Sequence, residues 1–136
     1  MKPLQLIQNG AARLICCIDR REHITPVLKD LHWLPVEARI LFKILLTVYK
    51  CLNLSAPQYL LNDLHVKTQP FNFRSSHTIS LLRPQHCNNF SARAFRNSAP
   101  TLWCNLPTSV KTCTSLTAFK KGLKTFLFEK YYVTVC

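Results

Sequence analysis

Apolar residues recur every three or four positions in several stretches of the chain, which is the spacing of one face of an α-helix. The first stretch has one apolar stripe with polar residues off it, which predicts a helix. The stripe consists of Leu4, Ile7, Ala11, Leu14 and Ile18. The pattern predicts a mainly α protein with four to five helices. The predicted helices are residues 3–18, 25–31, 35–53, 56–64 and 115–130.

The middle of the chain lacks this period. We expect an irregular segment or a short β-hairpin around residues 71–90, with a strand at Ile79–Arg83. A short helix is predicted over Ser91–Asn97 and should end near Pro100, because the residue before a proline is biased away from the α region. The predicted organisation is an N-terminal helical segment, a linker or short strands, and a C-terminal basic helical segment, forming one small domain or a fragment of a larger one. Their bounds are residues 1–64, 65–90 and 91–136.

Two Trp-containing turns have the same pattern of apolar residues and proline. Trp33 is followed by Leu34-Pro35, and Trp103 is followed after two residues by Leu106-Pro107. A large aromatic side chain beside a helix boundary is typical of a core anchor. We therefore expect Trp33, Pro35, Trp103 and Pro107 to be structural anchors.

Composition places the chain among globular proteins. Its 136 residues are 48% hydrophobic and 18% charged, so it can bury a core. No apolar run is long enough for a membrane span, and the N-terminus lacks the apolar region of a signal peptide. The seven cysteines are an odd number without framework spacing, which favours free thiols. We expect an intracellular protein, cytoplasmic or nuclear, without a membrane partner.

The net charge of +12 is unevenly distributed. Residues 1–66 hold 8 Lys and Arg and 5 Asp and Glu, whereas residues 67–136 hold 10 and 1. Such a basic region, beside Phe95, Tyr131 and Tyr132, fits phosphate contact and base stacking without reading sequence. It equally fits a solvated face that keeps the domain soluble. The candidate nucleic-acid-binding residues are Arg74, Arg93, Arg96, Lys111, Lys120, Lys121 and Lys124.

Nothing in the sequence points to catalysis. The six carboxylates are scattered, and the two glycines cannot form a phosphate-binding loop. A metal site would have to draw on a few residues that lack paired-ligand spacing. These are His77, His86, Cys87, Cys104 and Cys113. We expect no enzymatic activity, no cofactor and no metal.

Several segments of the chain, taken together, resemble a known protein family. The most specific block is His23-Ile24-Thr25-Pro26-Val27-Leu28, followed by Leu31-His32-Trp33-Leu34-Pro35-Val36. Weaker matches follow in order to Leu127-Phe128. Over nearly its whole length the chain resembles the C-terminal tail of LINE-type (non-LTR, jockey-like) retrotransposon reverse transcriptases. The weaker matches include Arg93-Ala94-Phe95, Leu102-Trp103, Phe119-Lys120 and Leu123-Lys124.

The resemblance implies a helical accessory segment that follows the polymerase and lies near RNA or DNA. The family's catalytic aspartates and endonuclease lie upstream of this segment, so no catalytic residue carries over. Because Met1 falls almost where the tail begins, the resemblance implies an orphaned tail, a decayed element copy or a recruited fragment. Three functions fit: a sequence-independent RNA- or DNA-binding region, a docking module for a missing polymerase body or for self-association through apolar helix faces, and a remnant without selected function.

Overall fold

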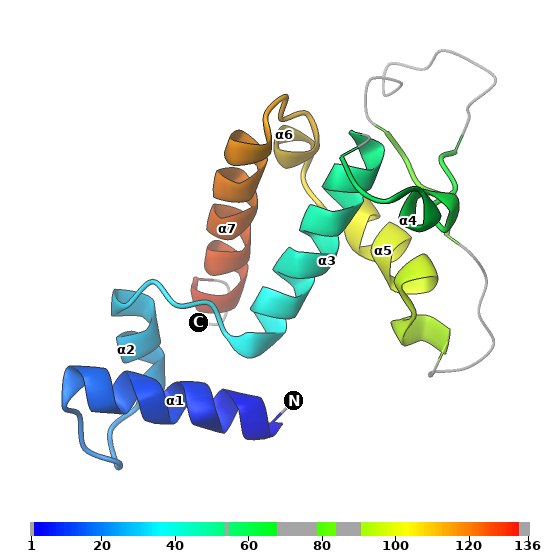
Figure 1. Ribbon diagram of the computed structural model, residues 1–136. Coiled ribbons are helices and arrows are strands. Elements are labelled where there is room, and N and C mark those ends of the chain that lie inside the picture. The colour runs from blue at the N-terminus through cyan, green and yellow to red at the C-terminus, as the bar shows by residue number, and fades with distance from the viewer. Residues whose placement is uncertain (1, 54, 68–78, 84–90, 134–136) are drawn as a thin grey trace. The chain divides into compact units, whose positions relative to one another are not determined.

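The computed structural model describes residues 2–53, 55–67, 79–83 and 91–133, and this part of the chain is mainly helical (Figure 1). Two compact units divide the chain: Met1–Phe42 with Lys124–Cys136, called here the terminal unit, and Lys43–Leu123, called the central unit. The boundary between the two units falls inside two helices, α3 (Val36–Leu52) and α7 (Leu116–Tyr132). The elements in order are α1 (Lys2–Cys16), α2 (Ile24–Asp30), α3 (Val36–Leu52), α4 (Gln58–Asn62), the 3₁₀ turn η1 (Ser91–Arg93), α5 (Phe95–Cys104), α6 (Thr108–Lys111) and α7 (Leu116–Tyr132).

All five predicted helices are present, as α1, α2, α3, α4 and α7, but the expected number was too low. Among the described residues there are seven α-helices, because α6 was not predicted and α5 was expected only as a short helix over Ser91–Asn97. The expected β-hairpin is also not seen there. The described part of residues 71–90 contributes a single antiparallel bridge between Val66 and Leu81, and the remainder lies outside the described residues.

The prediction that a helix ends near Pro100 was wrong. Helix α5 begins at Phe95 and continues through Pro100 to Cys104. The proline removes the backbone donor that would bond to the carbonyl one turn earlier. Ala99 and Pro100 are both buried, so packing of this side of the helix offsets the missing hydrogen bond. Tertiary burial here overrides a local preference.

The terminal unit has a small apolar core between α1 and α2. Ala12, Val27 and Leu28 are buried there. A residue in the left-handed region follows each helix: Cys17, with φ 51°, comes directly after α1, and His32, with φ 53°, comes two residues after the end of α2. In each case the next amide donates to a carbonyl five residues back, Ile18 to Arg13 and Trp33 to Leu28, which is the closure of a Schellman motif. The side chains packed against this core are Cys16, Ile18, Ile24, Leu31, Trp33 and Tyr132.

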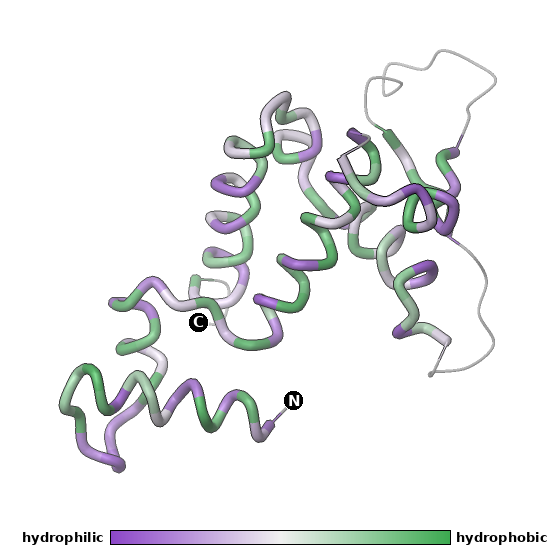
Figure 2. Tube along the Cα trace, viewed as in Figure 1, coloured by the Kyte–Doolittle hydropathy of each residue, from purple (hydrophilic) through white to green (hydrophobic). Residues whose placement is uncertain are grey.

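Helix α1 turns part of its polar side inward. Gln8 is only 8% exposed, and its Nε2 donates to the Leu34 carbonyl at 2.9 Å. Gln5 accepts the first amide of α3, that of Val36, at 2.9 Å. The apolar positions that recur along α1 in Figure 2 are solvent-exposed, with Leu14 at 81%. Two glutamines therefore cap the turn into α3, and the apolar stripe remains outside.

Trp33 and Pro35 anchor the terminal unit at that turn. The Trp33 ring is half-buried, with the Arg39 guanidinium 5.9 Å from its centroid, and its carbonyl accepts a hydrogen bond from the Tyr132 hydroxyl. The Pro35 carbonyl accepts the amide of Arg39 at 3.0 Å in the first turn of α3. Both residues thus fix where α3 begins.

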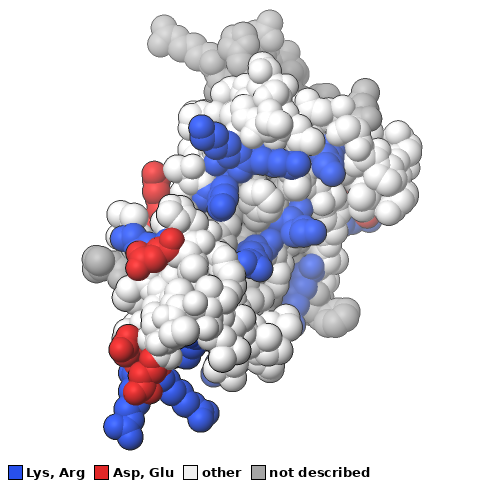
Figure 3. Space-filling model, turned by 60° about the vertical axis from the view of Figure 1, so that its left-hand side comes forward, with Lys and Arg blue, Asp and Glu red and all other residues white. Residues whose placement is uncertain are grey.

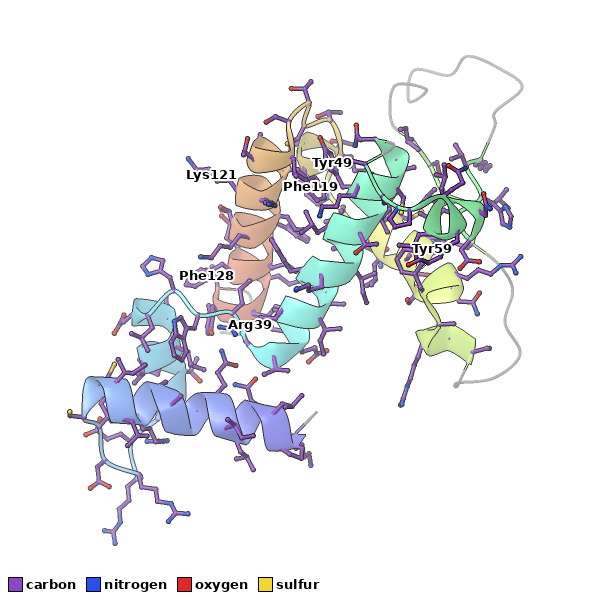
Figure 4. The ribbon with its side chains drawn as sticks, viewed as in Figure 1. Arg39, Tyr49, Tyr59, Phe119, Lys121 and Phe128 are labelled. Atoms are coloured by element: carbon purple, nitrogen blue, oxygen red, sulfur yellow. The ribbon has the colours of Figure 1, made fainter. Side chains whose placement is uncertain are left out.

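The central unit is built on three stacked rings. Tyr49 from α3 and Phe119 from α7 face each other with ring centroids 4.1 Å apart (Figure 4). Trp103 from α5 lies on Phe119 at 6.1 Å. All three residues are at most 5% exposed. The Tyr49 hydroxyl donates to the Cys113 carbonyl at 2.9 Å, so its polar end is satisfied as well.

Trp103 and Pro107 hold the segments around this core. The Trp103 indole donates to the Ile79 carbonyl at 3.0 Å and so ties residues 79–83 to α5. Pro107 precedes α6 and its carbonyl accepts the amide of Val110 at 3.2 Å. The four expected anchors therefore lie at element boundaries or in the core.

Candidate nucleic-acid interface

Helix α7 separates a basic side from an apolar one. It begins after Ser115, whose hydroxyl accepts the amide of Ala118 at 3.2 Å, as an N-cap does. Phe119, Leu123 and Leu127 are buried. Lys120, Lys121 and Lys124 are exposed at the intervening positions, and Figure 4 places Lys121 and Phe119 on opposite sides of the helix. Residues three and four apart are neighbours on a helix surface, so these lysines form a short basic row.

Arg93 and Arg96 form a second basic site at the start of α5. Arg93 ends η1, Arg96 lies in the first turn of α5, and both side chains are exposed. An Arg96 amino group donates to Nε2 of His65 at 3.3 Å. Because a guanidinium cannot accept a hydrogen bond, the ring nitrogen is the acceptor in this contact. The contact links α5 to the residues beside the Val66–Leu81 bridge.

The bridge gathers cations that the sequence analysis did not single out. Lys67 and Leu82 donate their amides to the carbonyls of Ser80 and His65, each at 2.8 Å. A shallow pocket of about 370 Å³ lies beside it, flanked by the cationic side chains of Lys67 and Arg83. The remaining residues of its lining are Ser80, Leu81, Leu82 and Cys104. Such a pocket has the charge and the hydroxyl donor that suit a phosphate group.

Not every predicted basic residue is equally available. Lys111 is half-buried, and its ammonium donates to the Cys104 carbonyl at 3.1 Å. This contact caps the C-terminus of α5, where the helix dipole favours a positive charge. Arg74 lies outside the described residues. Figure 3 shows several Lys and Arg side chains in the upper and middle part of the face in view with no acidic side chain beside them, whereas those at the lower left lie against Asp and Glu.

The aromatic residues expected to stack on bases have other contacts. Tyr132 lies 4.7 Å from Phe128, ring to ring, and burial raises its pKa above 10.0 against the opposing effect of Arg39. Burial and then the charge and hydrogen bond of Glu37 raise the pKa of Tyr131. Phe95 is half-buried in α5. The geometry therefore supports contact with phosphates more than stacking with bases.

The thiols and histidines of the described residues form no metal cluster. Within the described ranges, no three His, Cys, Asp or Glu side chains come together as metal ligands would. Cys104 and Cys113 are free thiols, whereas His77, His86 and Cys87 lie outside the described residues. Cys51 is 1% exposed, and burial raises its pKa above 9.0, which disfavours the reactive thiolate.

No protein-family model, no curated protein and no solved structure matches the chain. None of the described helices combines the length and the apolar character that crossing a membrane requires.

Proposed function

We propose that this chain is a non-catalytic, sequence-independent nucleic-acid-binding region of the kind found at the tail of retrotransposon reverse transcriptases. The observation that carries the proposal is the charge of the central unit. Residues 43–123 hold ten Lys and Arg and a single acidic residue, Asp63. An imbalance of this size attracts a polyanion and contributes no information about base sequence.

The contacts would be made by three groups of cations. The lysine row on α7, the arginines at α5 and the pair flanking the pocket each present charge at the surface. These cations are not arranged along one element that could enter a groove and contact successive base edges. We therefore expect them to bind the backbone phosphates. Each phosphate neutralised releases counterions and steepens the log–log salt dependence by about 0.9 on B-DNA or about 0.7 on single strands.

The test is fluorescence anisotropy of the full chain with a structured RNA and a matched single-stranded DNA over a salt series. The double variant Lys120→Glu and Lys121→Glu, which alters two exposed residues of the central unit, should weaken binding and reduce the salt slope by about 1.5. Its matched control is Arg20→Glu with Arg21→Glu, which changes the net charge equally but alters exposed residues of the terminal unit. An equal loss of affinity in both variants would show that only the net charge of the chain matters. Absence of binding near physiological salt would refute the proposal.

A second candidate function is that of a protein-interaction module. The observation that favours it is the exposed apolar side of α1, where Leu6 and Ile7 are each 69% exposed. Large exposed apolar patches usually mark interaction sites.

A further inference from the structure

The exposed side of α1 is a continuous apolar surface. Leu4, Leu6, Ile7, Leu14 and Ile15 are between 57% and 81% exposed. At 100° per residue these side chains occupy about half of the helix circumference, with Gly10 and Ala11 between them. We call these seven residues the α1 apolar face. A soluble domain normally buries such a face, so something is expected to cover it.

The middle of the face is shaped for close approach. Gly10 is exposed, and a Cβ built on it would meet nothing within 4 Å. The terminal unit therefore does not require a glycine here, although glycine weakens a helix interior. A second helix crossing at Gly10 would come closer to the α1 backbone than any side chain would allow, with the larger side chains on either side.

The charges around the α1 apolar face argue against an acidic partner and against a membrane surface as its occupant. The face itself contains no charged residue, and Arg13 of the same helix is engaged with the Asp19 and Glu22 carbonyls of the following loop. A chain with a net charge of +12 would meet an acidic partner best on its basic surfaces, and this face is not one of them. Membrane-surface helices have a polar side rich in Lys and Arg, whereas α1 has only Lys2 and Arg13, and its polar side also has glutamines packed inside the unit.

We infer that the α1 apolar face docks on the same face of a second copy of this chain, with the two helices antiparallel and crossing at Gly10. In this register Leu6 of one copy lies opposite Leu14 of the other. Lys2 at one end then lies near Asp19 at the other end, and both are exposed. The face is thus complementary to itself in shape, in apolar character and in charge, as a twofold interface requires.

The inference rests on the interaction-module function and is independent of nucleic-acid binding. A specific interface needs about 600–800 Å² from each copy, and a single helix face lies at the lower end of this range. A weak dimer is therefore expected. Sedimentation equilibrium of the full, nuclease-treated chain in high salt, over roughly 1 µM to 1 mM, should show a monomer–dimer equilibrium. High salt suppresses association bridged by nucleic acid but not apolar docking.

Two matched substitutions test the face. Ile7→Glu should raise the dimer dissociation constant at least about tenfold, because it places two like charges in an apolar contact. Tyr59→Glu is the control, since Tyr59 on α4 is 68% exposed against 69% for Ile7 and lies outside the face (Figure 4). Circular dichroism checks that both variants fold. A chain that stays monomeric at every concentration overturns the inference and leaves the face to a polymerase body or another partner. A dimer that survives Ile7→Glu also overturns it.

A charge exchange tests whether the occupant is a second copy in this register. Lys2→Glu and Asp19→Lys should each weaken the dimer by about 2- to 30-fold, because every dimer contains the pair twice. The double variant should recover the original affinity, since the pair is restored with its signs exchanged. Failure of this recovery would overturn the antiparallel register. If the monomeric chain binds anionic vesicles and Ile7→Glu abolishes this binding, the dimer is overturned and the face is assigned to a lipid surface.

Discussion

The two units stabilise themselves in different ways. The central unit stacks Tyr49, Phe119 and Trp103 in a dry core and carries its charge outside. The terminal unit has a smaller apolar core and relies on directional hydrogen bonds, such as those of Gln5 and Gln8 to the turn before α3. The comparison teaches that apolar content alone does not locate a core, because α1 holds many apolar residues and buries a glutamine.

The same contrast separates the two candidate functions. The central unit has ten cations and one carboxylate, whereas the terminal unit has eight and five and is therefore nearer to neutral. Long-range attraction of a polyanion is thus expected from the central unit. Apolar docking is expected from the terminal unit, where the α1 apolar face is exposed. The following changes would break or sharpen this division.

The largest effect is expected in the ring stack. Phe119→Ala removes a fully buried ring that contacts both Tyr49 and Trp103 and should lower the free energy of unfolding by about 3–5 kcal/mol. Phe128→Ala is the matched change in the terminal unit, where the ring is half-buried, and should cost about half as much. Urea denaturation measures both. Similar losses in the two variants would contradict the difference between the units.

A smaller effect should distinguish the two sides of α1. Gln8→Ala removes one of two donors to the Leu34 carbonyl, which keeps its hydrogen bond from Arg39 Nε at 3.2 Å, and should cost about 0.5–1.5 kcal/mol. Leu14→Ala on the same helix should change the free energy of unfolding by less than about 0.5 kcal/mol, because Leu14 is exposed. Thermal melts at low concentration, where the chain is monomeric, compare the two. A larger loss for the leucine would show that the apolar side faces inward.

The smallest effect is a loss of stability at alkaline pH, and it arises in the terminal unit. Burial raises the pKa of Tyr132 above its unfolded value of 10.0, so folding favours the protonated phenol. This contribution is fully present below pH 10 and is lost as the pH rises through the folded pKa. The melting temperature should therefore fall more steeply above about pH 10 in the wild type than in Tyr132→Phe. Titration of buried Cys51 is common to both proteins and cancels, so parallel curves would contradict the prediction.

Much of the fold follows from helical periodicity. The stretches that became α3 and α7 repeat apolar residues over many turns, and their side chains indicated both the helix and its buried side. For α1 the period predicted the helix correctly but did not indicate which side is buried. The Leu34 carbonyl accepts a hydrogen bond from Gln8, and the Val36 amide donates one to Gln5. Both pairs join residues that are far apart in the sequence, so a local pattern does not reveal them. Likewise, α5 continues through Pro100 because of burial that no local signal encodes.

The candidate interface was predictable where one helix provides it. The row Lys120, Lys121 and Lys124 follows from spacing alone. The pocket between Lys67 and Arg83 was missed, since a bridge between distant residues forms it. Lys111 was grouped with the phosphate ligands because sequence shows its charge but not the Cys104 carbonyl that it caps.

The chain's two tryptophans fall one in each unit, Trp33 in the terminal unit and Trp103 in the central unit. Trp103 is 2% exposed, whereas Trp33 is half-buried beneath a guanidinium. Indole emission shifts with polarity, so the natural protein contains an optical probe for each unit. Single Trp→Phe variants would separate the two signals and show whether the units lose their structure together or one after the other.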